Sequence, residues 1–195
     1  MIDLEKLKAE NLARWQVCKI LPAWQYILDD VAHKLVGAKA RYQTVEAKTN
    51  VPWPVIAVIH QREASQSWLA SLAQGDPWNH ISIHEPRGRG PFPSWEAAAI
   101  DALAICPPHA ASWHDWSIGG ALTLLEQYNG LGYFRMGRPS PYIWASTDQY
   151  HSGKYIADGH YDPSAVDHQT GCAALLQRMT LLDQSIAGEW NASNH

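Results

Sequence analysis

Apolar residues recur at helical spacing along most of this chain. In the first segment they stand at Leu4, Leu7, Leu12 and Trp15, and Pro22 follows as a breaker. Pro, Gly and Ser residues at the borders of similar stretches mark further helix starts and ends. The spacing predicts helices over residues 3–19, 24–36, 38–48, 53–63, 64–73, 95–105, 117–128 and 168–186. The pattern therefore predicts a mainly α fold.

Two stretches interrupt the helical pattern. Residues 79–93 combine a brief alternation of apolar and polar residues with Gly, Pro and Arg, which predicts a small β-hairpin or an irregular excursion. Residues 130–163 are rich in Gly, Pro, Tyr and Trp and are expected to form loops. The chain has no internal repeat and no linker-like tract. We therefore expect a single domain over residues 1–195, with N-terminal helices in 1–36 and a flexible tail in 188–195.

Composition and charge exclude several classes of protein. Fifteen Lys and Arg against nineteen Asp and Glu give a net charge of −4, which argues against a nucleic-acid partner. The apolar stretch 51–59 is too short to cross a membrane, so no stable membrane insertion is expected. The N-terminus is charged and amphipathic, and we expect synthesis in the cytoplasm without a cleavable signal. Three cysteines without CxxC spacing predict no disulfide framework. We expect a monomer.

Glu63 stands at the end of the apolar segment 53–63, and the helical spacing brings Ile59 and His60 onto its face. A carboxyl group held against apolar side chains is costly to ionise, so its pKa rises and it suits proton donation near neutrality. The alternative is a structural glutamate that pairs with Arg62 or another base. The pattern by itself leaves both interpretations open.

Several short runs occur in an order that resembles a known family. They are Ala57–Ser65 with its glutamate, Leu72–Pro77, Trp95–Leu103, Leu125–Tyr133 with Tyr-Asn-Gly-Leu-Gly-Tyr, Ser140–Trp144 and Lys154–Asp158. Together they resemble the lysozyme superfamily: goose-type lysozymes, lytic transglycosylases and phage endolysin-type muramidases. The resemblance covers about residues 40–180. The Gly-Leu-Met-Gln run usual in goose-type enzymes is absent, and the excursion from His80 to Pro93 stands in its place.

The resemblance implies a lysozyme-like fold and a peptidoglycan substrate. The reaction implied is cleavage of the β-1,4 bond between N-acetylmuramic acid and N-acetylglucosamine, with Glu63 protonating the leaving oxygen. No cofactor or metal is expected. The enzyme would act on the cell wall after release, and both hydrolysis and formation of an anhydro sugar remain open.

Asp76 is the best candidate for a second catalytic group. It follows Glu63 in a Gly-Asp-Pro turn, where a loop carboxylate is expected to stay solvated and ionised and could activate water. The alternative is a turn-starting Asp before Pro.

Aromatic residues supply candidates for a sugar-binding cleft, since the chain has ten Trp and eight Tyr against two Phe. Tyrosine and tryptophan rings stack on pyranose faces, and an Asn side chain can bond an N-acetyl group. Core packing is the competing role for each ring. Four loop arginines are candidates for binding peptide carboxylates of the wall: Arg87, Arg89, Arg135 and Arg138. The candidate substrate-binding residues are Ser67, Tyr128, Asn129, Tyr133, Tyr142 and Trp144.

Ten histidines raise a rival hypothesis of a zinc-dependent cell-wall amidase or peptidase. His80 and His84 are four residues apart, and His109 and His114 flank Trp113, but the sequence has no HExxH motif. A non-catalytic glycan-binding module and a chitinase-like glycosidase are further alternatives. A serine hydrolase is disfavoured because no GxSxG motif occurs.

Overall fold

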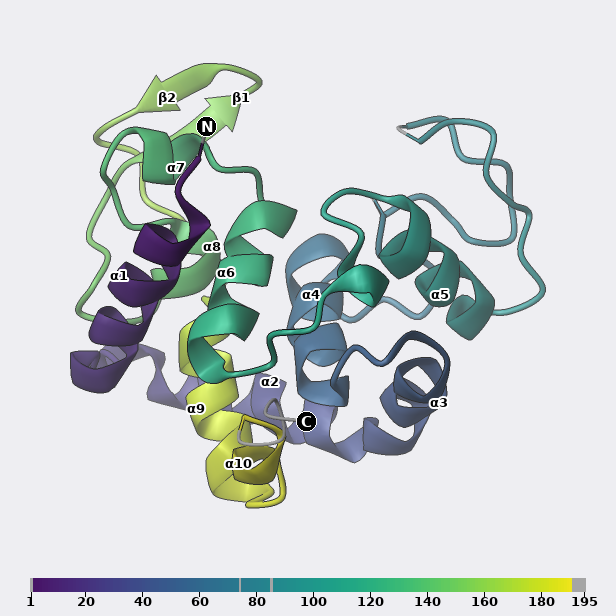
Figure 1. The fold of residues 1–195 in the computed structure, drawn as a ribbon, viewed down its shortest axis with the longest axis horizontal. Helices are drawn as coiled ribbons and strands as arrows, with labels where there is room; N and C mark the ends of the chain where they lie inside the picture. Colours follow the sequence, from purple (N-terminus) through teal and green to yellow (C-terminus); the bar gives the residue numbers. More distant parts are fainter. Residues whose placement is uncertain (1, 74, 85, 191–195) are drawn as a thin grey trace.

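A computed structural model describes residues 2–73, 75–84 and 86–190 (Figure 1). The first half contains α1 (Leu4–Val17), α2 (Gln25–Gly37), α3 (Lys39–Thr49) and α4 (Trp53–Ala64), and the middle contains α5 (Trp95–Ile105) and α6 (Ile118–Tyr128). The last third contains α7 (Gly132–Arg135), α8 (Pro141–Trp144), β1 (Lys154–Ala157), β2 (His160–Asp162), α9 (Cys172–Leu182) and α10 (Ile186–Glu189). The expectation of a mainly α fold with a small β-hairpin is confirmed.

The helix expected over residues 64–73 is wrong. Ser65 and Gln66 both adopt left-handed backbone conformations, with φ of 48° and 62°. The Ser65 N–H donates to the Gln61 carbonyl and the Gln66 N–H donates to the His60 carbonyl, which ends α4. The residues that follow Gln66, up to 73, form turns and no helix.

The hairpin lies in the stretch expected to be loop. Strands β1 and β2 pair antiparallel, with Lys154 opposite Asp162, and Gly159 supplies the positive φ of the turn between them. The described part of 79–93 is an irregular excursion without strands, one of the two forms expected there. It is held by bonds such as that from the Ser82 N–H to the Arg89 carbonyl.

The C-terminal helix is shorter than expected. It begins at Cys172, directly after Gly171, whose N–H donates to the Ala145 carbonyl at 3.2 Å, and it ends at Leu182. The expected flexible tail overlaps α10 at Gly188 and Glu189, and residues 191–195 lie outside the described residues.

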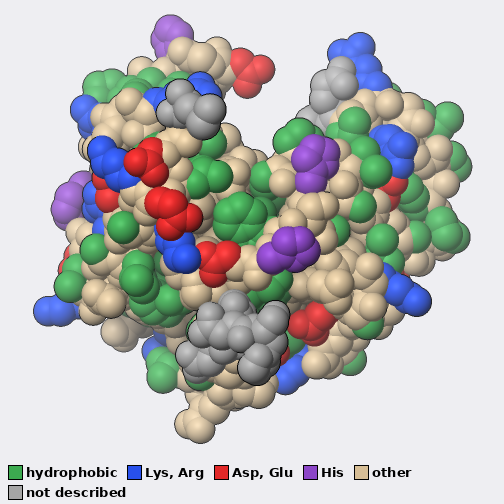
Figure 2. Space-filling view, viewed as in Figure 1, with side chains coloured by type: hydrophobic (Ala, Val, Ile, Leu, Met, Phe, Trp, Pro, Cys, Tyr) green, Lys and Arg blue, Asp and Glu red, His purple; other side chains and the backbone are tan. Residues whose placement is uncertain are grey.

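Helix α4 lies between two groups of elements. Figure 1 shows α3, α5 and the loop after α4 on one side, and α1, α6, α7, α8 and the hairpin on the other. The space-filling view in Figure 2 is hollowed between these two lobes, with apolar side chains at the base of the hollow. Every residue of α4 from Trp53 to His60 is buried, so this helix is the centre of the core.

The start of α4 is set by its sequence. Pro52 precedes the helix and Pro54 stands in its first turn, where a missing N–H costs nothing. The Trp53 N–H donates to the Glu46 carboxylate at 3.1 Å. A fixed start and the left-handed residues at its end determine where the last turn of α4, which carries Glu63, lies.

His60 ties α4 to the chain reversal that follows Glu63. Its Nε2 lies 3.0 Å from the Ser67 carbonyl oxygen, and its Nδ1 lies 3.0 Å from the Tyr42 hydroxyl. A carbonyl only accepts, so Nε2 carries the proton and Nδ1 accepts from Tyr42. Burial lowers the pKa of His60 to about 4, against the bond to Ser67, which acts in the opposite direction.

Within the described residues, no helix combines the length and the apolar content that crossing a bilayer requires.

The neutral state of His60 can be tested by NMR. We expect its imidazole to titrate with a pKa of about 4 and to carry its proton on Nε2. Between about pH 6.5 and 4 the unfolded chain binds a proton that the folded chain does not. The contribution of neutral His60 to the free energy of unfolding is therefore lost as the pH falls through this window. Titration near pH 6.5 would contradict the buried, doubly bonded state.

Candidate active site

Glu63 lies in the last turn of α4 with its side chain half-buried. One carboxylate oxygen, Oε1, accepts a hydrogen bond from the Tyr142 hydroxyl at 2.8 Å. No ion pair to Glu63 occurs among the described residues, and its neighbour Arg62 instead binds Asp167 at 2.9 Å. The ion pair between Glu63 and Arg62, one form of the structural alternative, therefore does not occur.

Burial raises the pKa of Glu63 to about 6. Two groups act in the other direction: the Tyr142 hydroxyl donates to the ionised form, and Arg62 contributes a positive charge. A carboxyl with this pKa is divided between acid and base forms near neutrality. It can therefore give up a proton and take one back.

Tyr142 is held by the short helix α8 and is 4% exposed. The Ser140 side chain caps α8 by accepting from the Tyr142 N–H at 3.2 Å, and it also accepts from the Asn129 side chain at 3.1 Å. The Arg62 guanidinium lies over the Tyr142 ring, 4.7 Å from its centroid. The hydroxyl that meets Glu63 is thus held between α4 and the segment that runs from Asn129 to α8.

A buried ion cluster joins α4 to the loop before α9. The side chains of Arg62 and Asp167 are 6% and 4% exposed, and Arg62 also donates to the Thr170 carbonyl at 3.2 Å. Lys154 on β1 lies 3.5 Å from the other Asp167 oxygen. Burial opposes the ionised form of Asp167, but Arg62 and the other donors outweigh it and hold its pKa below the ordinary value.

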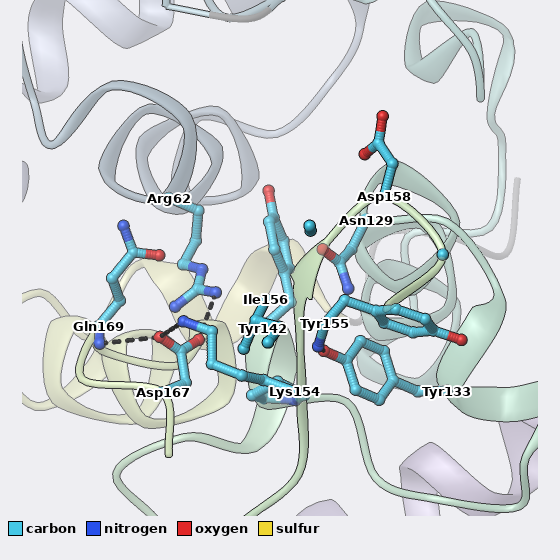
Figure 3. A pocket seen from close by; sticks show the side chains of 13 residues that line it. Arg62, Asn129, Tyr133, Tyr142, Lys154, Tyr155, Ile156, Asp158, Asp167 and Gln169 are labelled. Carbon is cyan, nitrogen blue, oxygen red and sulfur yellow. Dashed lines mark hydrogen bonds and ion pairs between the residues drawn. The ribbon is translucent and has the colours of Figure 1, made fainter. Parts of the chain in front are cut away.

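A cavity of about 410 Å³ lies between this cluster and the hairpin (Figure 3). Glu63 itself is not among the lining residues, but its neighbour Arg62 and its hydrogen-bond partner Tyr142 are. In Figure 3 the charged cluster occupies one end, and Asn129, Tyr133 and Tyr155 occupy the other. The cavity is lined by Arg62, Asn129, Tyr133, Pro141, Tyr142, Lys154, Tyr155, Ile156, Ala157, Asp158, Gly159, Asp167 and Gln169.

The hairpin wall of the cavity is positioned by tyrosines. The Tyr155 N–H donates to the Tyr133 hydroxyl at 3.0 Å, and the rings of Tyr133, Tyr155 and Tyr161 meet edge to face. A Cβ at Gly132 would lie 3.0 Å from the Tyr155 hydroxyl, so a glycine allows this close approach. The Tyr-Asn-Gly-Leu-Gly-Tyr run therefore supplies the Asn129 side chain, and its Gly132 and Tyr133 contact Tyr155 of the hairpin.

Three of the expected sugar-binding residues line this cavity and three do not. Asn129, Tyr133 and Tyr142 line it. Tyr128 is half-buried and donates to the Leu72 carbonyl at 3.1 Å, while Ser67 is exposed and its carbonyl binds His60. Trp144 is 1% exposed and packs in the core. The expectation that Trp144 stacks on a sugar is corrected, because its ring has no free face.

Asp76 stands at the start of the irregular segment after α4 and binds the backbone of residues 83 and 84 within it. Its carboxylate accepts from the Ile83 and His84 N–H groups at 3.2 and 3.0 Å and meets His84 Nδ1 at 2.7 Å. The expected solvation is wrong, since Asp76 is 7% exposed. The hydrogen bonds that the His84 side chain and N–H donate to Asp76 hold its pKa below the ordinary value, although desolvation acts in the opposite direction. These contacts fit the turn-closing alternative, and a role as catalytic base stays a prediction.

Asp76 nevertheless comes directly after Gly75, whose backbone lies close to the backbone of Glu63. A Cβ at Gly75 would lie 3.5 Å from the Glu63 carbonyl oxygen. The Asp76 carbonyl also accepts from the Ser71 N–H at 2.8 Å, which closes the turn beside the end of α4.

The four candidate arginines do not form one cluster. Arg87 and Arg89 belong to the excursion in one lobe, and Arg89 pairs with Asp101. Arg135 ends α7 in the other lobe, where Arg138 lies over the Tyr161 ring. They therefore cannot act together as one carboxylate-binding site.

A zinc site receives no support from the geometry. Within residues 2–73, 75–84 and 86–190, no group of three or more His, Cys, Asp or Glu side chains is placed to hold a metal ion. His80 bonds the neighbouring Asn79 side chain at 2.8 Å, and His84 bonds Asp76.

Glu126 is a second buried carboxyl that the sequence patterns did not single out. It is on α6, and burial raises its pKa to about 8. It faces a small space of about 20 Å³ with Asn11 and Arg14 of α1, apart from the large cavity. A raised pKa is therefore not unique to Glu63, and the neighbouring cavity distinguishes the two carboxyls.

Comparison of the chain with protein-family models, curated proteins and solved structures finds no match.

The cost of ionising Glu63 can be measured as stability. Its pKa is raised from 4.5 to about 6, so its contribution to stability falls as the pH rises through this window. Glu63→Gln removes that cost. We compare the free energy of unfolding of the variant with that of the wild type at pH 7.5 and at pH 4. The difference in favour of the variant should be larger at pH 7.5 by on the order of 1 kcal/mol. Urea unfolding at the two pH values measures the gain, and an equal difference at both would contradict a raised pKa.

Proposed function

We propose that this protein is a glycoside hydrolase that cleaves the β-1,4 bond between N-acetylmuramic acid and N-acetylglucosamine in peptidoglycan. Glu63 serves as the general acid. The observation that carries the proposal is the hydrogen bond at 2.8 Å between the Glu63 carboxyl and Tyr142, a residue that lines a large cavity. Burial raises the pKa of this carboxyl to about 6. The order of motifs that resembles endolysin-type muramidases supports the choice of polymer.

The surroundings of Glu63 suit both halves of a proton transfer. Burial keeps the carboxyl protonated at mildly acidic pH, so it has a proton for the glycosidic oxygen. Once the proton leaves, the Tyr142 hydroxyl and the charge of Arg62 stabilise the carboxylate that remains. The same two groups prevent the pKa from rising further.

The cavity offers groups of the kind that sugars require. The rings of Tyr133, Tyr142 and Tyr155 line it, and the exposed Asn129 amide can bond an N-acetyl group. A cavity of about 410 Å³ is in the range of small-molecule sites. It therefore holds part of a glycan strand, and the rest of the strand would continue along the hollow between the lobes.

Two routes complete the reaction. Water activated by a second carboxylate, for which Asp76 is the candidate, would give hydrolysis. Attack by a hydroxyl of the substrate itself would give an anhydro sugar. Mass spectrometry of the released muropeptides distinguishes the two, because the anhydro product is one water lighter.

The acid assignment is tested with purified cell walls. We expect Glu63→Gln to lower the rate of release of reducing ends and anhydro ends by about 100-fold or more, because general-acid catalysis is lost. Glu126→Gln is the matched control, since it removes another buried acid that does not border the cavity. Its rate should stay near that of the wild type.

Other outcomes identify other functions. Full activity in Glu63→Gln would remove the acid assignment. Activity lost on chelation would favour a zinc amidase. Retention of walls without new sugar ends would favour a binding module, and cleavage of chitin alone would favour a chitinase.

The pH dependence should follow Glu63. Activity is expected to fall as the pH rises through about 6, because the acid then loses its proton. Tyr142→Phe removes the bond that favours the ionised form, so the pKa rises and the alkaline limb moves to higher pH. The profile of kcat/KM against pH measures this shift, and an unmoved or lowered limb would show that Tyr142 does not tune the acid.

A further inference from the structure

The charges around the large cavity are divided between its ends. Figure 3 shows Arg62, Asp167 and Lys154 together at one end, while the Asp158 carboxylate points away from them. The lining of this end therefore holds two cationic side chains and one carboxylate.

Asp167 does not use the donors of Lys154 fully. One Asp167 oxygen accepts from Arg62 at 2.9 Å, and the other accepts from the Gln169 N–H at 3.2 Å and meets Lys154 only at 3.5 Å. Arg62 is buried and makes a further bond to Thr170. Lys154 has three N–H donors, and Asp167 is its one hydrogen-bond partner within the part of the chain that the structure describes.

Lys154 is also the accessible cation of the cluster. Its side chain is 33% exposed, against 6% for Arg62, and it lies on β1 in the wall of the cavity. Arg62 has its Nε buried without a hydrogen-bond partner, so its charge is not fully used by protein groups. An anionic group entering this end would meet Lys154 first, with the field of Arg62 behind it.

We propose that Lys154 binds a carboxylate carried by the glycan and thereby selects strands that contain muramic acid over neutral chitin. This inference rests on the proposed function. The carboxylate has two sources in the wall: the lactyl group of N-acetylmuramic acid where the peptide has been removed, and the acidic residues of the peptide where it is attached. Both place a negative charge beside the sugar whose bond Glu63 would cleave.

Binding of three probes tests the inference without cleavage. Titration calorimetry or NMR on the intact protein compares N-acetylglucosaminyl-N-acetylmuramic acid, the same disaccharide with an L-Ala-D-Glu dipeptide on the lactyl group, and neutral chitobiose. We expect at least one acidic probe to bind about 5-fold or more tighter than chitobiose, with the advantage shrinking as salt is added. Which acidic probe is preferred identifies the source of the carboxylate.

Three variants make the test specific to Lys154. Lys154→Gln should lose the preference for the acidic probe, whereas Lys154→Arg should keep it because the charge remains. Lys48→Gln on α3 is the control, since that lysine is exposed and lies outside the cavity lining, and it should keep the full preference.

The failures of the two proposals can be told apart. Equal binding of acidic and neutral probes by the wild type, or an unchanged preference in Lys154→Gln, overturns the role of Lys154 while cleavage by Glu63 can stand. Preferential binding by a protein that releases no sugar ends from walls overturns the proposed reaction and leaves the carboxylate site.

Discussion

The cost of ionising one half-buried carboxyl is the constraint on which this site depends. Helix α4 is buried from Trp53 to His60, and its last turn carries the half-buried Glu63 beside Arg62, which lines the cavity. A carboxylate there loses hydration that the protein replaces only in part, through one hydroxyl at 2.8 Å. The hydration that is not replaced raises the pKa of Glu63 and favours its protonated form.

Helix geometry explains why Arg62 does not neutralise its neighbour. Successive residues on a helix point about 100° apart, so Arg62 and Glu63 leave α4 in different directions. Arg62 is bound by Asp167 and Thr170 and acts on Glu63 only through its field and through the Tyr142 ring. Asp167 thus provides the ion-pair partner of Arg62, and Glu63 does not. Without that partner, a buried arginine beside Glu63 would stabilise the carboxylate directly and lower its pKa.

The sequence predicts the helical framework and the position of Glu63 better than it predicts the rest of the candidate site. Residues 53–63 carry a periodic apolar pattern with proline at the start, and both features act locally, so α4 and the place of Glu63 follow from them. The Tyr-Asn-Gly run pointed to Asn129, Tyr133 and, further on, Tyr142, which do line the cavity. The chain reversal at Ser65 and Gln66 was missed because neither residue favours a left-handed backbone strongly enough to be recognised. Tertiary contacts, such as the bond from His60 to Ser67, stabilise it.

The charged end of the cavity had no visible signal in the sequence. Arg62 and Asp167 are 105 residues apart along the chain, and Lys154 comes from a hairpin in a stretch expected to be loop. For Trp144 the sequence pattern predicts a sugar-binding role, but the residue is buried in the core. Spacing along a chain does not reveal which face of a short helix such as α8 meets the cavity.

The central claim is that burial raises the pKa of Glu63 to about 6, so that it keeps its proton at mildly acidic pH, and carbon-detected NMR of glutamate-labelled protein measures this directly. The account predicts a side-chain carboxyl resonance that titrates with a pKa of about 6 and is absent from the Glu63→Gln spectrum. A Glu63 resonance that titrates near the ordinary value of 4.5 would contradict the account.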